Sequence, residues 1–383
     1  MQPNMPDHDA ETGSVKPDDF AREVYGVMGI PIDAVDMASV LRRIGSAAIT
    51  RQPFLISTAN LNFLVNSRAD AEFRESLLLS DLCTADGMPI IWIARLLGVP
   101  LKERIAGADI FDALKSWHYA TRRLKAFLFG GAEGVAAAVC KKLNDEDGTL
   151  ICAGSHDPGF CSVEAMSTGA IIDEINSSNA DFLAAALGAK KGQAWLLRNH
   201  DRLLVPVRVH LGATLNFQAG LIKRAPAWLQ SSGLEWLWRI KEEPQLWRRY
   251  RNDGLALLEL ILTRIVPILL DCGWNRLRGG QNNQNLTIEQ ADEHDSVTLS
   301  VNGNAIGRHV DGAAASFRNA AAAGKDVRIN FTNTRQMDAR FLGLLLMLNK
   351  HLKKRGLQLG ITRPPPRIAR IFRQNGFEFL LDS

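Results

Sequence analysis

The fold is decided by stretches such as Phe182-Leu183-Ala184-Ala185-Ala186-Leu187, in which apolar residues follow one another without a polar residue. A strand with one face in water would alternate apolar and polar residues, so this run predicts a strand that is buried on both faces. Other strand candidates of mostly apolar character lie at residues 54–57, 124–129, 150–153 and 205–211. Helical periodicity fills the intervals, for example at residues 33–48, 61–79 and 134–143. This alternation predicts an α/β fold with a Rossmann-like, mainly parallel sheet that helices cover on both faces.

The chain is long enough for more than one domain, since it has 383 residues and 46% of them are hydrophobic. A strongly apolar segment at residues 253–271 is followed by a polar run at residues 279–285 (GGQNNQN), which is typical of a linker. We predict a disordered tail (1–20), a first α/β domain (21–252), an apolar amphipathic helix (253–274), a linker (275–286) and a second, smaller α/β domain (287–383).

The cysteines and the amino-terminal residues indicate the cellular compartment of the protein. The cysteines are scattered and include no C-x-x-C pair, which favours a reducing compartment and argues against a zinc site or a disulfide framework. They are Cys83, Cys140, Cys152, Cys161 and Cys272. The first twenty residues are polar and lack the apolar stretch of a signal peptide, so we expect a cytoplasmic protein. The formal net charge of +4 does not by itself indicate binding of nucleic acid.

Asp86 is the first candidate for a catalytic residue. It lies in the turn Thr84-Ala85-Asp86-Gly87-Met88-Pro89, between two apolar, helix-like stretches. A carboxylate followed by glycine in a strand-to-helix loop can act as a general base, and the alternative is a helix N-cap. Ligands of such folds bind at the carboxyl ends of the strands, where Thr58 and Asn60 also follow a strand. The alternative for these two residues is a turn or a cap on the next helix.

Two other loops have sequences that are found in phosphate-binding or metal-binding sites. The loop at residues 130–134 (GGAEG) follows a strand and opens a helix, a geometry that can hold phosphate on backbone N–H groups. It is not a complete G-x-G-x-x-G motif and no ribose-binding acid follows at the expected place, so a nicotinamide-dependent oxidoreductase is disfavoured. Asp145-Glu146-Asp147 has the form of a D-x-D metal motif, but we interpret it as a solvated turn at the end of a helix. We predict no cofactor and no metal site.

Three loops and one long motif resemble the WecG/TagA/CpsF family of bacterial glycosyltransferases, also called glycosyltransferase family 26. The resemblance covers about residues 24–250. The loops are residues 57–60 (STAN), 84–89 (TADGMP) and 104–109 (RIAGAD), and the most specific stretches are residues 220–228 (GLIKRAPAW), 233–239 (GLEWLWR) and Glu243-Pro244. The resemblance implies an inverting enzyme of polysaccharide biosynthesis that transfers a sugar from a UDP-sugar to a saccharide on polyprenyl diphosphate. Candidate sugars are N-acetylmannosamine, its uronic acid, glucuronic acid and glucose.

The resemblance also implies roles for single residues. Asp86 would be the general base that takes the proton from the acceptor hydroxyl. Substrate-binding residues would be Thr58, Asn60, Arg104, Asp109, Gln193, Arg239, Arg248 and Arg249, with the last three near the diphosphate of the lipid. An arginine fork is well suited to a diphosphate.

The chain departs from the family pattern at several positions. Family members usually have Pro-Lys-Gln-Glu where this chain has Lys190-Lys191-Gly192-Gln193, so the expected glutamine falls on Gly192 and Gln193 is the candidate substitute. Asn216 stands where aspartate is usual, and Leu246 stands at a family arginine position that Arg248 could replace. These departures leave open an alternative, a catalytically decayed scaffold that acts through its second domain.

Tryptophan and basic residues are interleaved between residues 228 and 251. Such a mixture occurs in proteins that bind single-stranded nucleic acid, but it is also typical of a membrane–water interface that faces anionic lipid. Because an apolar helix follows directly, we expect peripheral association with the inner-membrane surface and no nucleic-acid partner. On an ideal helix Asp253, Arg264 and Asp271 fall on nearly one line, as in an interfacial helix. The alternative is that the helix packs against the protein's own domains.

The last hundred residues resemble the STAS domain of anti-anti-sigma factors and sulfate transporters, on residues 326–331 and 337–345. We expect a small α/β domain with strands near residues 297–301, 327–331 and 357–362. That family commonly carries a phosphorylatable serine or threonine after an aspartate, whereas here Asp338 is followed by Ala339 and Arg340. We therefore expect this STAS-like domain to bind a protein or a small ligand without phosphorylation at these positions.

Overall fold

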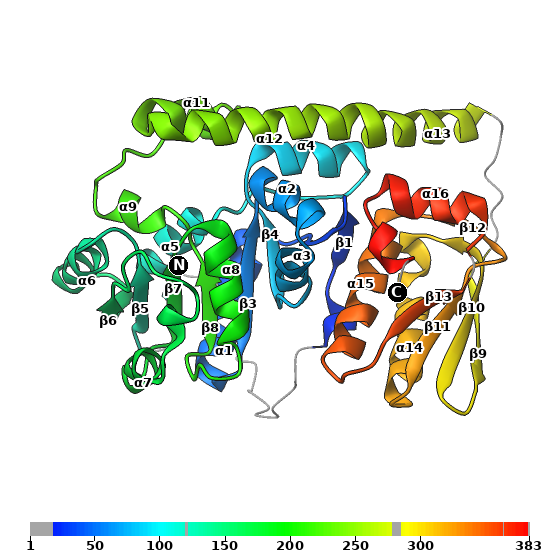
Figure 1. The fold of residues 1–383 in the computed structure, drawn as a ribbon, viewed down its shortest axis with the longest axis horizontal. Coiled ribbons are helices and arrows are strands. Elements are labelled where there is room, and N and C mark those ends of the chain that lie inside the picture. Colours follow the sequence, from blue (N-terminus) through cyan, green and yellow to red (C-terminus); the bar gives the residue numbers. More distant parts are fainter. Residues whose placement is uncertain (1–17, 119–121, 278–284, 363, 382–383) are drawn as a thin grey trace, which may run out of the picture.

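The computed structural model describes residues 18–118, 122–277, 285–362 and 364–381. Its larger domain is built on a sheet of six parallel strands in the order β4-β3-β8-β7-β5-β6 (Figure 1). The strands are β3 (Phe54–Ala59), β4 (Leu82–Ala85), β5 (Leu124–Gly130), β6 (Leu150–His156), β7 (Phe182–Ala186) and β8 (Val207–His210). The predicted parallel α/β sheet is confirmed.

Both faces of this sheet are covered, which explains why its strands are apolar throughout. In β7, Phe182 and Ala184 belong to the core on one face, and Leu183 and Ala185 belong to the core on the other. The first face is covered by α1 (Met37–Thr50), α5 (Gly107–Ser116) and α6 (Val135–Asp145), and the second by α7 (Gly169–Ser177) and α8 (Ala189–Arg198).

A two-stranded hairpin lies beside the main sheet. It consists of β1 (Val24–Val27) and β2 (Ile30–Asp33), and it packs on α2 (Leu61–Ala69), α3 (Ala71–Leu78) and α4 (Met88–Leu96). The predicted tail ends earlier than residue 20, since Phe20 is buried and Asp19 pairs with Arg22 at 2.9 Å. The rest of that predicted tail, residues 1–17, lies outside the described residues.

The second domain is a small α/β unit, as predicted. Its parallel strands are ordered β12-β10-β11-β13, and β9 pairs with β10 in the antiparallel direction. The elements are β9 (Thr287–Asp292), β10 (Ser296–Ala305), α14 (Val310–Ala322), β11 (Asp326–Asn330), β12 (Thr334–Met337), α15 (Ala339–Lys353), β13 (Leu359–Thr362) and α16 (Pro366–Gln374). We did not expect β9 and β12; β9 is largely exposed and β12 is short, so neither shows a clear apolar pattern.

Helix α15 binds the second domain tightly to the first. A Cβ atom on Gly343 would lie 2.1 Å from the backbone oxygen of Val24, so only glycine permits this close approach of the helix to β1. Further along α15, the fully buried Lys350 lies 2.7 Å from Asp19 and 2.9 Å from Asp81. The two domains therefore share a buried interface with both apolar packing and ion pairs.

A long helix runs across both domains (Figure 1). It comprises α12 (Trp247–Leu260), a π-helical turn (Ile261–Ile265) and α13 (Val266–Leu277), so it begins before the predicted residue 253. The three polar residues predicted to fall on one line all contact protein: Asp253 accepts from Asn62, Arg264 pairs with Glu378 at 2.8 Å, and Asp271 accepts from Gln374 at 3.2 Å. Most of the predicted linker lies outside the described residues.

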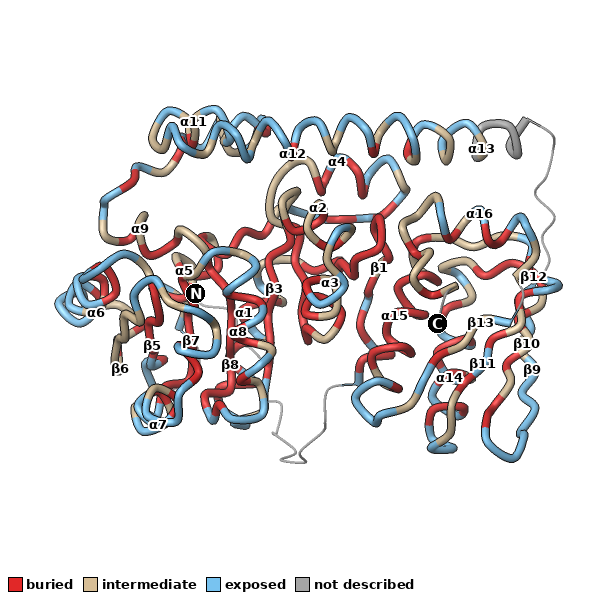
Figure 2. Tube along the Cα trace, in the orientation of Figure 1, coloured by how far each residue is buried: buried red, intermediate tan, exposed pale blue. Residues whose placement is uncertain are grey.

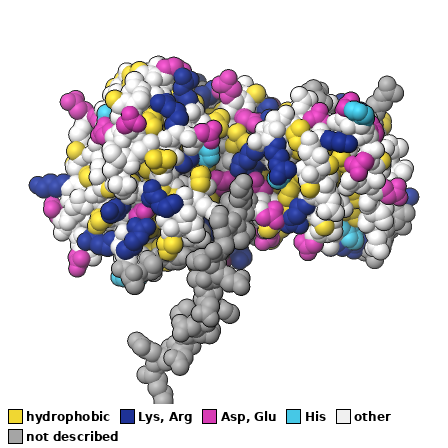
Figure 3. Space-filling view, turned by 90° about the horizontal axis from the view of Figure 1, so that it is seen from below, with side chains coloured by type: hydrophobic (Ala, Val, Ile, Leu, Met, Phe, Trp, Pro, Cys, Tyr) yellow, Lys and Arg dark blue, Asp and Glu magenta, His cyan; other side chains and the backbone are white. Residues whose placement is uncertain are grey.

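The opposite side of this helix is exposed and apolar. Figure 2 shows exposed residues along its outer side, and the large apolar ones are Leu255, Leu258, Leu262, Val266, Leu269 and Leu270. On the face of the molecule that points away from this helix, acidic and basic side chains are mixed with scattered apolar ones (Figure 3). No helix in the described ranges combines the length and the apolar character needed to cross a membrane.

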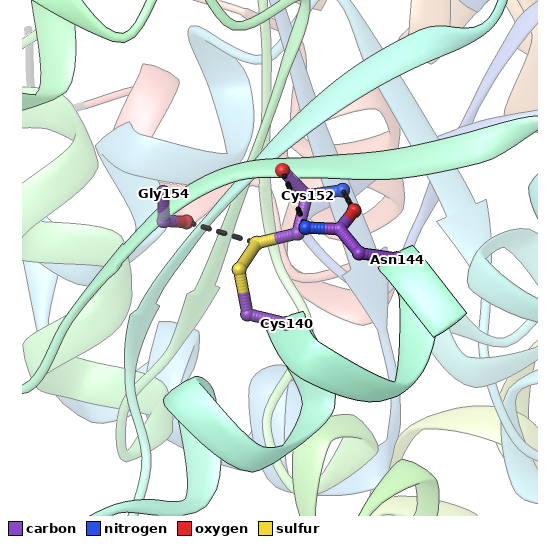
Figure 4. Close-up of a disulfide and its surroundings, with 4 residues drawn as sticks. All are labelled: Cys140, Asn144, Cys152 and Gly154. Atoms are coloured by element: carbon purple, nitrogen blue, oxygen red, sulfur yellow. Dashed lines mark hydrogen bonds between the residues drawn. A yellow bond between two sulfur atoms is a disulfide. The ribbon is translucent and has the colours of Figure 1, made fainter. Parts of the chain in front are cut away.

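Cys140 of α6 and Cys152 of β6 form a disulfide, so the prediction of no disulfide was wrong (Figure 4). Their Cα atoms lie 5.0 Å apart, within the range that a disulfide requires, because α6 packs back onto β6. Asn144 fixes the strand beside the helix by accepting from the N–H of Cys152 at 2.9 Å. No sequence motif marks such a helix-to-strand pair, and the inference of a reducing compartment loses its support.

Candidate active site

The carboxyl ends of β3 and β4 bring the first site residues together. Ala59 lies opposite Ala85 in the parallel register, and the N–H of Asp86 donates to the carbonyl of Ala59 at 2.8 Å. Asn60 and Asp86 therefore leave the sheet edge as neighbours. Gly87 follows with a φ of 106°, which side chains rarely tolerate, and this turn leads the chain into α4.

Asp86 does not cap a helix. The N-cap position of α4 is Gly87, and no side-chain hydrogen bond caps that helix. The nearest basic group to the Asp86 carboxylate is Arg104, whose Nη1 lies 3.7 Å away. The side chain of Asp86 is 24% exposed, so a substrate hydroxyl can approach it. Of the two interpretations drawn from the sequence, this position favours the general base.

The environment of Asp86 makes it a stronger base than an ordinary aspartate. Burial is the main cause that raises the pKa of Asp86 to about 7. The carboxylates of Glu235 and Asp109 raise the pKa further by charge repulsion, whereas Arg104 and Arg224 lower it. A carboxylate with a near-neutral pKa is well matched to proton transfer from a hydroxyl at neutral pH.

Arg104 is surrounded by several acceptors at once. Its side chain is 13% exposed, and it donates to Asp109 at 3.0 Å, to Gln230 at 3.1 Å and to Glu235 at 3.3 Å. The planar guanidinium is thus shared among these groups and the more distant Asp86. An anionic ligand can bind Arg104 only by replacing one of these partners.

The segment after the sheet supplies site residues that we did not select from the sequence. Arg224 pairs with Asp109 and with Asp112, the latter at 2.9 Å. Gln230 lies in α10 (Ala227–Ser231) and Glu235 begins α11 (Glu235–Glu242). Arg224 and Glu235 lie in the stretches 220–228 and 233–239 that carry the family resemblance, which was the available signal, and Gln230 lies between these stretches.

Of the predicted binding residues, Thr58 is buried, and Asn60 and Asp109 have structural contacts of their own. Thr58 is 4% exposed at the end of β3. Asn60 caps α2, because its Oδ1 accepts from the N–H of Phe63 at 3.2 Å, as the alternative interpretation held. Asp109 accepts from the N–H of Ala106 at 3.3 Å and binds Arg104. Asn60 and Asp109 therefore shape the loops around Asp86.

Gln193 lies deep in the structure. It is 1% exposed, and its amide nitrogen donates to Ser57 at 3.0 Å. This burial disfavours the substrate-binding role of Gln193, which stays a prediction. At Gly192, the family's glutamine position, a Cβ atom would lie 2.2 Å from the ring of His210. The ring of His210 bonds the carbonyl of Leu187 at 2.7 Å, and burial lowers the pKa of His210. A neutral histidine from β8 thus occupies the space beside position 192.

The three arginines expected at the acceptor diphosphate differ in their burial and in their contacts. Arg239 is 9% exposed, pairs with Glu243 at 2.5 Å and lies over the ring of Phe217 in α9 (Thr214–Gln218). Its Nη1 is buried and has no hydrogen-bond partner among the described residues. Arg248 and Arg249 are exposed on α12 and lie over neighbouring aromatic rings. Arg239 is therefore the one with a buried donor to offer a ligand.

The two other loops lie at opposite edges of the sheet. Gly130, Gly131 and Gly134 all have positive φ at the carboxyl edge, next to the amino terminus of α6. The acidic residues at 145–147 are exposed at the far end of α6, before β6 begins at the amino edge. The acidic turn is therefore remote from Asp86.

A carboxylate with a pKa near 7 beside an arginine, at the carboxyl edge of a parallel sheet, is suited to general-base chemistry on an enzyme's substrate. The chain belongs to the "Glycosyl transferase WecG/TagA/CpsF family", whose model matches residues 25–267. The protein is therefore a glycosyltransferase.

Two relatives carry the name "N-acetylglucosaminyldiphosphoundecaprenol N-acetyl-beta-D-mannosaminyltransferase". The relative from Bacillus spizizenii is 27% identical over 194 residues, which are 51% of this chain and 73% of the relative. The relative from Bacillus subtilis (strain 168) is 28% identical over 196 residues, 51% of this chain and 74% of the relative.

The second domain matches the family model described as "Mlab, STAS domain" over residues 288–382, which confirms the STAS resemblance. A solved structure, "Structure of the Bacillus Cell Fate Determinant SpoIIAA in the Phosphorylated Form", is 19% identical with a TM-score of 0.22. It covers 25% of this chain and 88% of that chain.

Proposed function

We propose that this glycosyltransferase transfers a sugar of the N-acetylmannosamine type from its UDP derivative to a saccharide on undecaprenyl diphosphate or a similar polyprenyl diphosphate. The observation that carries this proposal is Asp86, with its raised pKa, beside Arg104 at the carboxyl edge of the sheet. The names of the two relatives support the sugar and the acceptor. The corresponding uronic acid, glucuronic acid and glucose remain candidate sugars.

In the proposed reaction Asp86 is the general base. The acceptor hydroxyl oxygen attacks the anomeric carbon of the donor and its proton moves to the Asp86 carboxylate. The bond between that carbon and the diphosphate oxygen breaks, and its electron pair leaves with UDP. Attack from the side opposite the leaving group inverts the anomeric configuration. Arg104 would exchange a carboxylate partner for the leaving diphosphate, whose charge it then stabilises.

A lipid-linked acceptor requires the site to reach a membrane surface. The exposed leucines of α12 and α13 support docking through this helix, and Trp228, Trp236 and Trp247 are exposed near its beginning. Arg248 and Arg249 add positive charge there for anionic lipid. We place the protein peripherally on the cytoplasmic surface of the inner membrane, as a component of polysaccharide biosynthesis.

We propose that the STAS-like domain binds a protein or a small ligand without phosphorylation after Asp338. Asp338 caps α15 by accepting from the N–H of Phe341 at 3.0 Å. The next residues are Ala339, which has no hydroxyl, and Arg340, which donates to the carbonyl of Val24 at 2.9 Å.

The proposed function is tested by transfer from radiolabelled UDP-sugars to N-acetylglucosamine on polyprenyl diphosphate. We expect transfer from UDP-N-acetylmannosamine, and we expect this donor to raise the melting temperature, since it binds only the folded state. Transfer with none of the UDP-sugars, in protein that is folded, would instead favour the alternative of a decayed scaffold. The comparisons support the transferase and give no support to that alternative.

A further inference from the structure

Helix α16 of the STAS-like domain carries its basic residues on one side. Arg367, Arg370 and Arg373 follow one another at intervals of three, so they lie on neighbouring turns of the same face. All three are exposed, whereas Ile368 and Phe372 on the opposite face are fully buried in the core of the domain. The helix contains no acidic residue. These three arginines, the α16 arginine stripe, therefore present positive charge to solvent.

Most of this charge has no counter-charge within the protein. In the part of the chain that the structure describes, only Arg370 of the three has a carboxylate partner, Asp271 of α13 at 3.5 Å. The side chain of Arg370 is still 60% exposed, so this ion pair is weak. Like charges on adjacent helical turns repel one another, and an anionic partner would relieve this repulsion. The stripe therefore fits a partner with negative charge.

The stripe lies next to the long helix that crosses both domains. Figure 1 shows α16 beside α13, and hydrogen bonds join them: Gln374 donates to Asp271 at 3.2 Å, and Arg264 donates to the carbonyl of Arg373. Asp271 directly follows Leu270, which is 68% exposed. Because the two helices are in contact, the stripe lies about one helix diameter, roughly 10 Å, from the exposed leucines.

This spacing matches the depth of a membrane interface. A helix that docks on a bilayer buries its apolar side by about 5–10 Å. The layer of lipid headgroups on each side of a bilayer is roughly 5–8 Å thick. An arginine one helix diameter from the inserted leucines therefore reaches the level of the headgroup phosphates, and its long side chain allows the guanidinium to remain hydrated there.

A second basic group lies at the other end of the long helix. Arg248, Arg249 and Arg251 are exposed on α12, and the helix rises by about 35 Å from Arg248 to Asp271. The exposed leucines thus lie between two groups of arginines. A nucleic acid would attract the arginines but would not bury the leucines between them. A surface that is apolar inside and anionic outside satisfies both.

We propose that the α16 arginine stripe binds the anionic headgroups of the membrane on which the long helix docks, so that the STAS-like domain itself lies on the bilayer. The inference rests on the proposed function for the docking of the long helix, and it adds a second contact from another domain. With contacts near both ends, the long helix lies parallel to the membrane surface. The orientation of the transferase domain toward the bilayer is then fixed.

The test is the double variant Arg367→Gln with Arg373→Gln, which removes two charges and leaves Arg370 with Asp271. We would measure Kd for liposomes of phosphatidylcholine alone and for liposomes that also contain phosphatidylglycerol. Each basic residue near an anionic surface strengthens binding by roughly fivefold, so Kd for the anionic liposomes should rise by about twenty- to thirtyfold. Kd for the zwitterionic liposomes should not change. The difference should disappear at an ionic strength of about 1 M, where the Debye length is only about 3 Å.

Arg318→Gln with Arg328→Gln is the matched control, because it removes two exposed arginines from the same domain. Their carboxylate partners are Asp18 and Glu293, which belong neither to α16 nor to the long helix. The control should bind both kinds of liposome as the wild type does.

Three results would overturn the proposal. One is an equal Kd of the stripe variant and the wild type for anionic liposomes, which includes the case that neither binds. Another is an equal loss of binding to both kinds of liposome, because the arginines would then act through the fold. The third is weaker binding of a single-stranded oligonucleotide with unchanged binding of liposomes, which would assign the stripe to nucleic acid.

Sugar transfer to an acceptor in detergent micelles separates this proposal from the proposed function. Both double variants should transfer as the wild type does, since the changed residues lie outside the candidate active site. If the wild type transfers no sugar and the stripe variant still loses binding to anionic liposomes, the stripe assignment stands and the proposed reaction is wrong. If the wild type transfers sugar and the stripe variant binds anionic liposomes as tightly, the reaction stands and the stripe assignment is wrong.

Discussion

The ammonium group of Lys350 in α15 lies 2.9 Å from a carboxylate oxygen of Asp81, the residue that precedes β4. The other carboxylate oxygen of Asp81 accepts from the N–H of Leu55 in β3 at 3.0 Å. The STAS-like domain is thus bound to the amino ends of the two strands whose carboxyl ends lead to Asn60 and Asp86. This domain is part of the framework that holds the transferase site.

Lys350→Met should destabilise both domains together. Burial alone would raise the pKa of Asp81, but Lys350, Lys354 and the N–H of Leu55 together hold the pKa below its usual range. Methionine keeps the length of the side chain and leaves buried carboxylates with weaker partners. Removing one partner of a buried ion pair typically costs about 3–5 kcal/mol. Chemical denaturation should show this loss in one transition shared by the two domains.

The control for Lys350→Met is Lys353→Met on the same helix. Lys353 pairs with Glu75 at 2.5 Å, but its side chain is 44% exposed, so the change should cost less than about 1 kcal/mol. Two separate transitions, with only the one for the STAS-like domain shifted by Lys350→Met, would contradict the shared framework.

Asp86→Asn should abolish transfer and still fold. Loss of a general base typically lowers the rate by about a hundredfold to ten-thousandfold. The raised pKa of Asp86 means that the folded state disfavours the ionised carboxylate. The wild type therefore loses stability as the pH rises from about 4 to about 7, and the loss persists above that range.

Asparagine carries no charge to bury, so Asp86→Asn should be at least as stable as the wild type at pH 8. The gain has an upper limit of about 4 kcal/mol, from a pKa difference of about three units, and it should vanish near pH 4. Melting temperatures of both proteins at pH 4 and pH 8 check this. A lower melting temperature of the variant at both pH values would mean that Asp86 stabilises the fold through a contact of its carboxylate.

Local features explain what could be predicted from the sequence. The parallel sheet could be predicted because strands such as β7 are apolar on both faces and are separated by helices. The turn at Asp86 could be selected because its carboxylate, glycine and proline follow one another. β4 could not be predicted because it has only four residues and includes the polar residue Thr84. Thr84 is buried, and its hydroxyl donates to the carbonyl of Ile105 at 3.0 Å.

Features that depend on distant contacts could not be predicted. Glu235 meets Arg104 across 131 positions, so its role depends on how α11 folds over the sheet. The interface of α15 depends on the hairpin at the other end of the chain. The same reason applies to His210, which lies beside Gly192 because β8 and α8 pack together.

Glu235→Gln should move the pH profile of transfer toward lower pH. The base must be ionised to accept a proton, so kcat/KM for the wild type should rise as the pH rises through about 7. Glu235 is one of the carboxylates that raise the pKa of Asp86, and glutamine removes its charge while keeping an acceptor for Arg104. The pH at which kcat/KM rises should therefore be lower in Glu235→Gln than in the wild type.

The matched control is Glu242→Gln at the other end of α11. Glu242 accepts from the N–H of Lys223 and is not among the groups that shift the pKa of Asp86. The pH at which kcat/KM rises should therefore be the same as in the wild type. Superimposable profiles for the wild type and Glu235→Gln would contradict the coupling between α11 and the base.

Membrane docking can be tested by flotation with liposomes that contain anionic lipid. Leu258→Glu with Leu262→Glu places two charges on the exposed row of the long helix, where the side chains are 53% and 60% exposed. The wild type should float and this variant should not, because carboxylates disfavour both the apolar and the anionic part of the interface. Ile49→Glu with Leu204→Glu changes two exposed apolar residues elsewhere and should float. Equal flotation of all three proteins would mean that another surface docks.

The redox state of Cys140 and Cys152 tests the proposed compartment. The bond closes a segment with a sequence separation of 12, and a crosslink of this span is worth about 3 kcal/mol in the chain-entropy account. Purified protein under oxidising conditions should therefore be more stable by about that amount than the double variant Cys140→Ser with Cys152→Ser. The control Cys161→Ser should have little effect on stability, since Cys161 is free.

In living cells we expect rapid alkylation to trap Cys140 and Cys152 as thiols, because disulfides seldom persist in a reducing cytoplasm. A disulfide trapped in cells at full occupancy would contradict placement on the cytoplasmic surface.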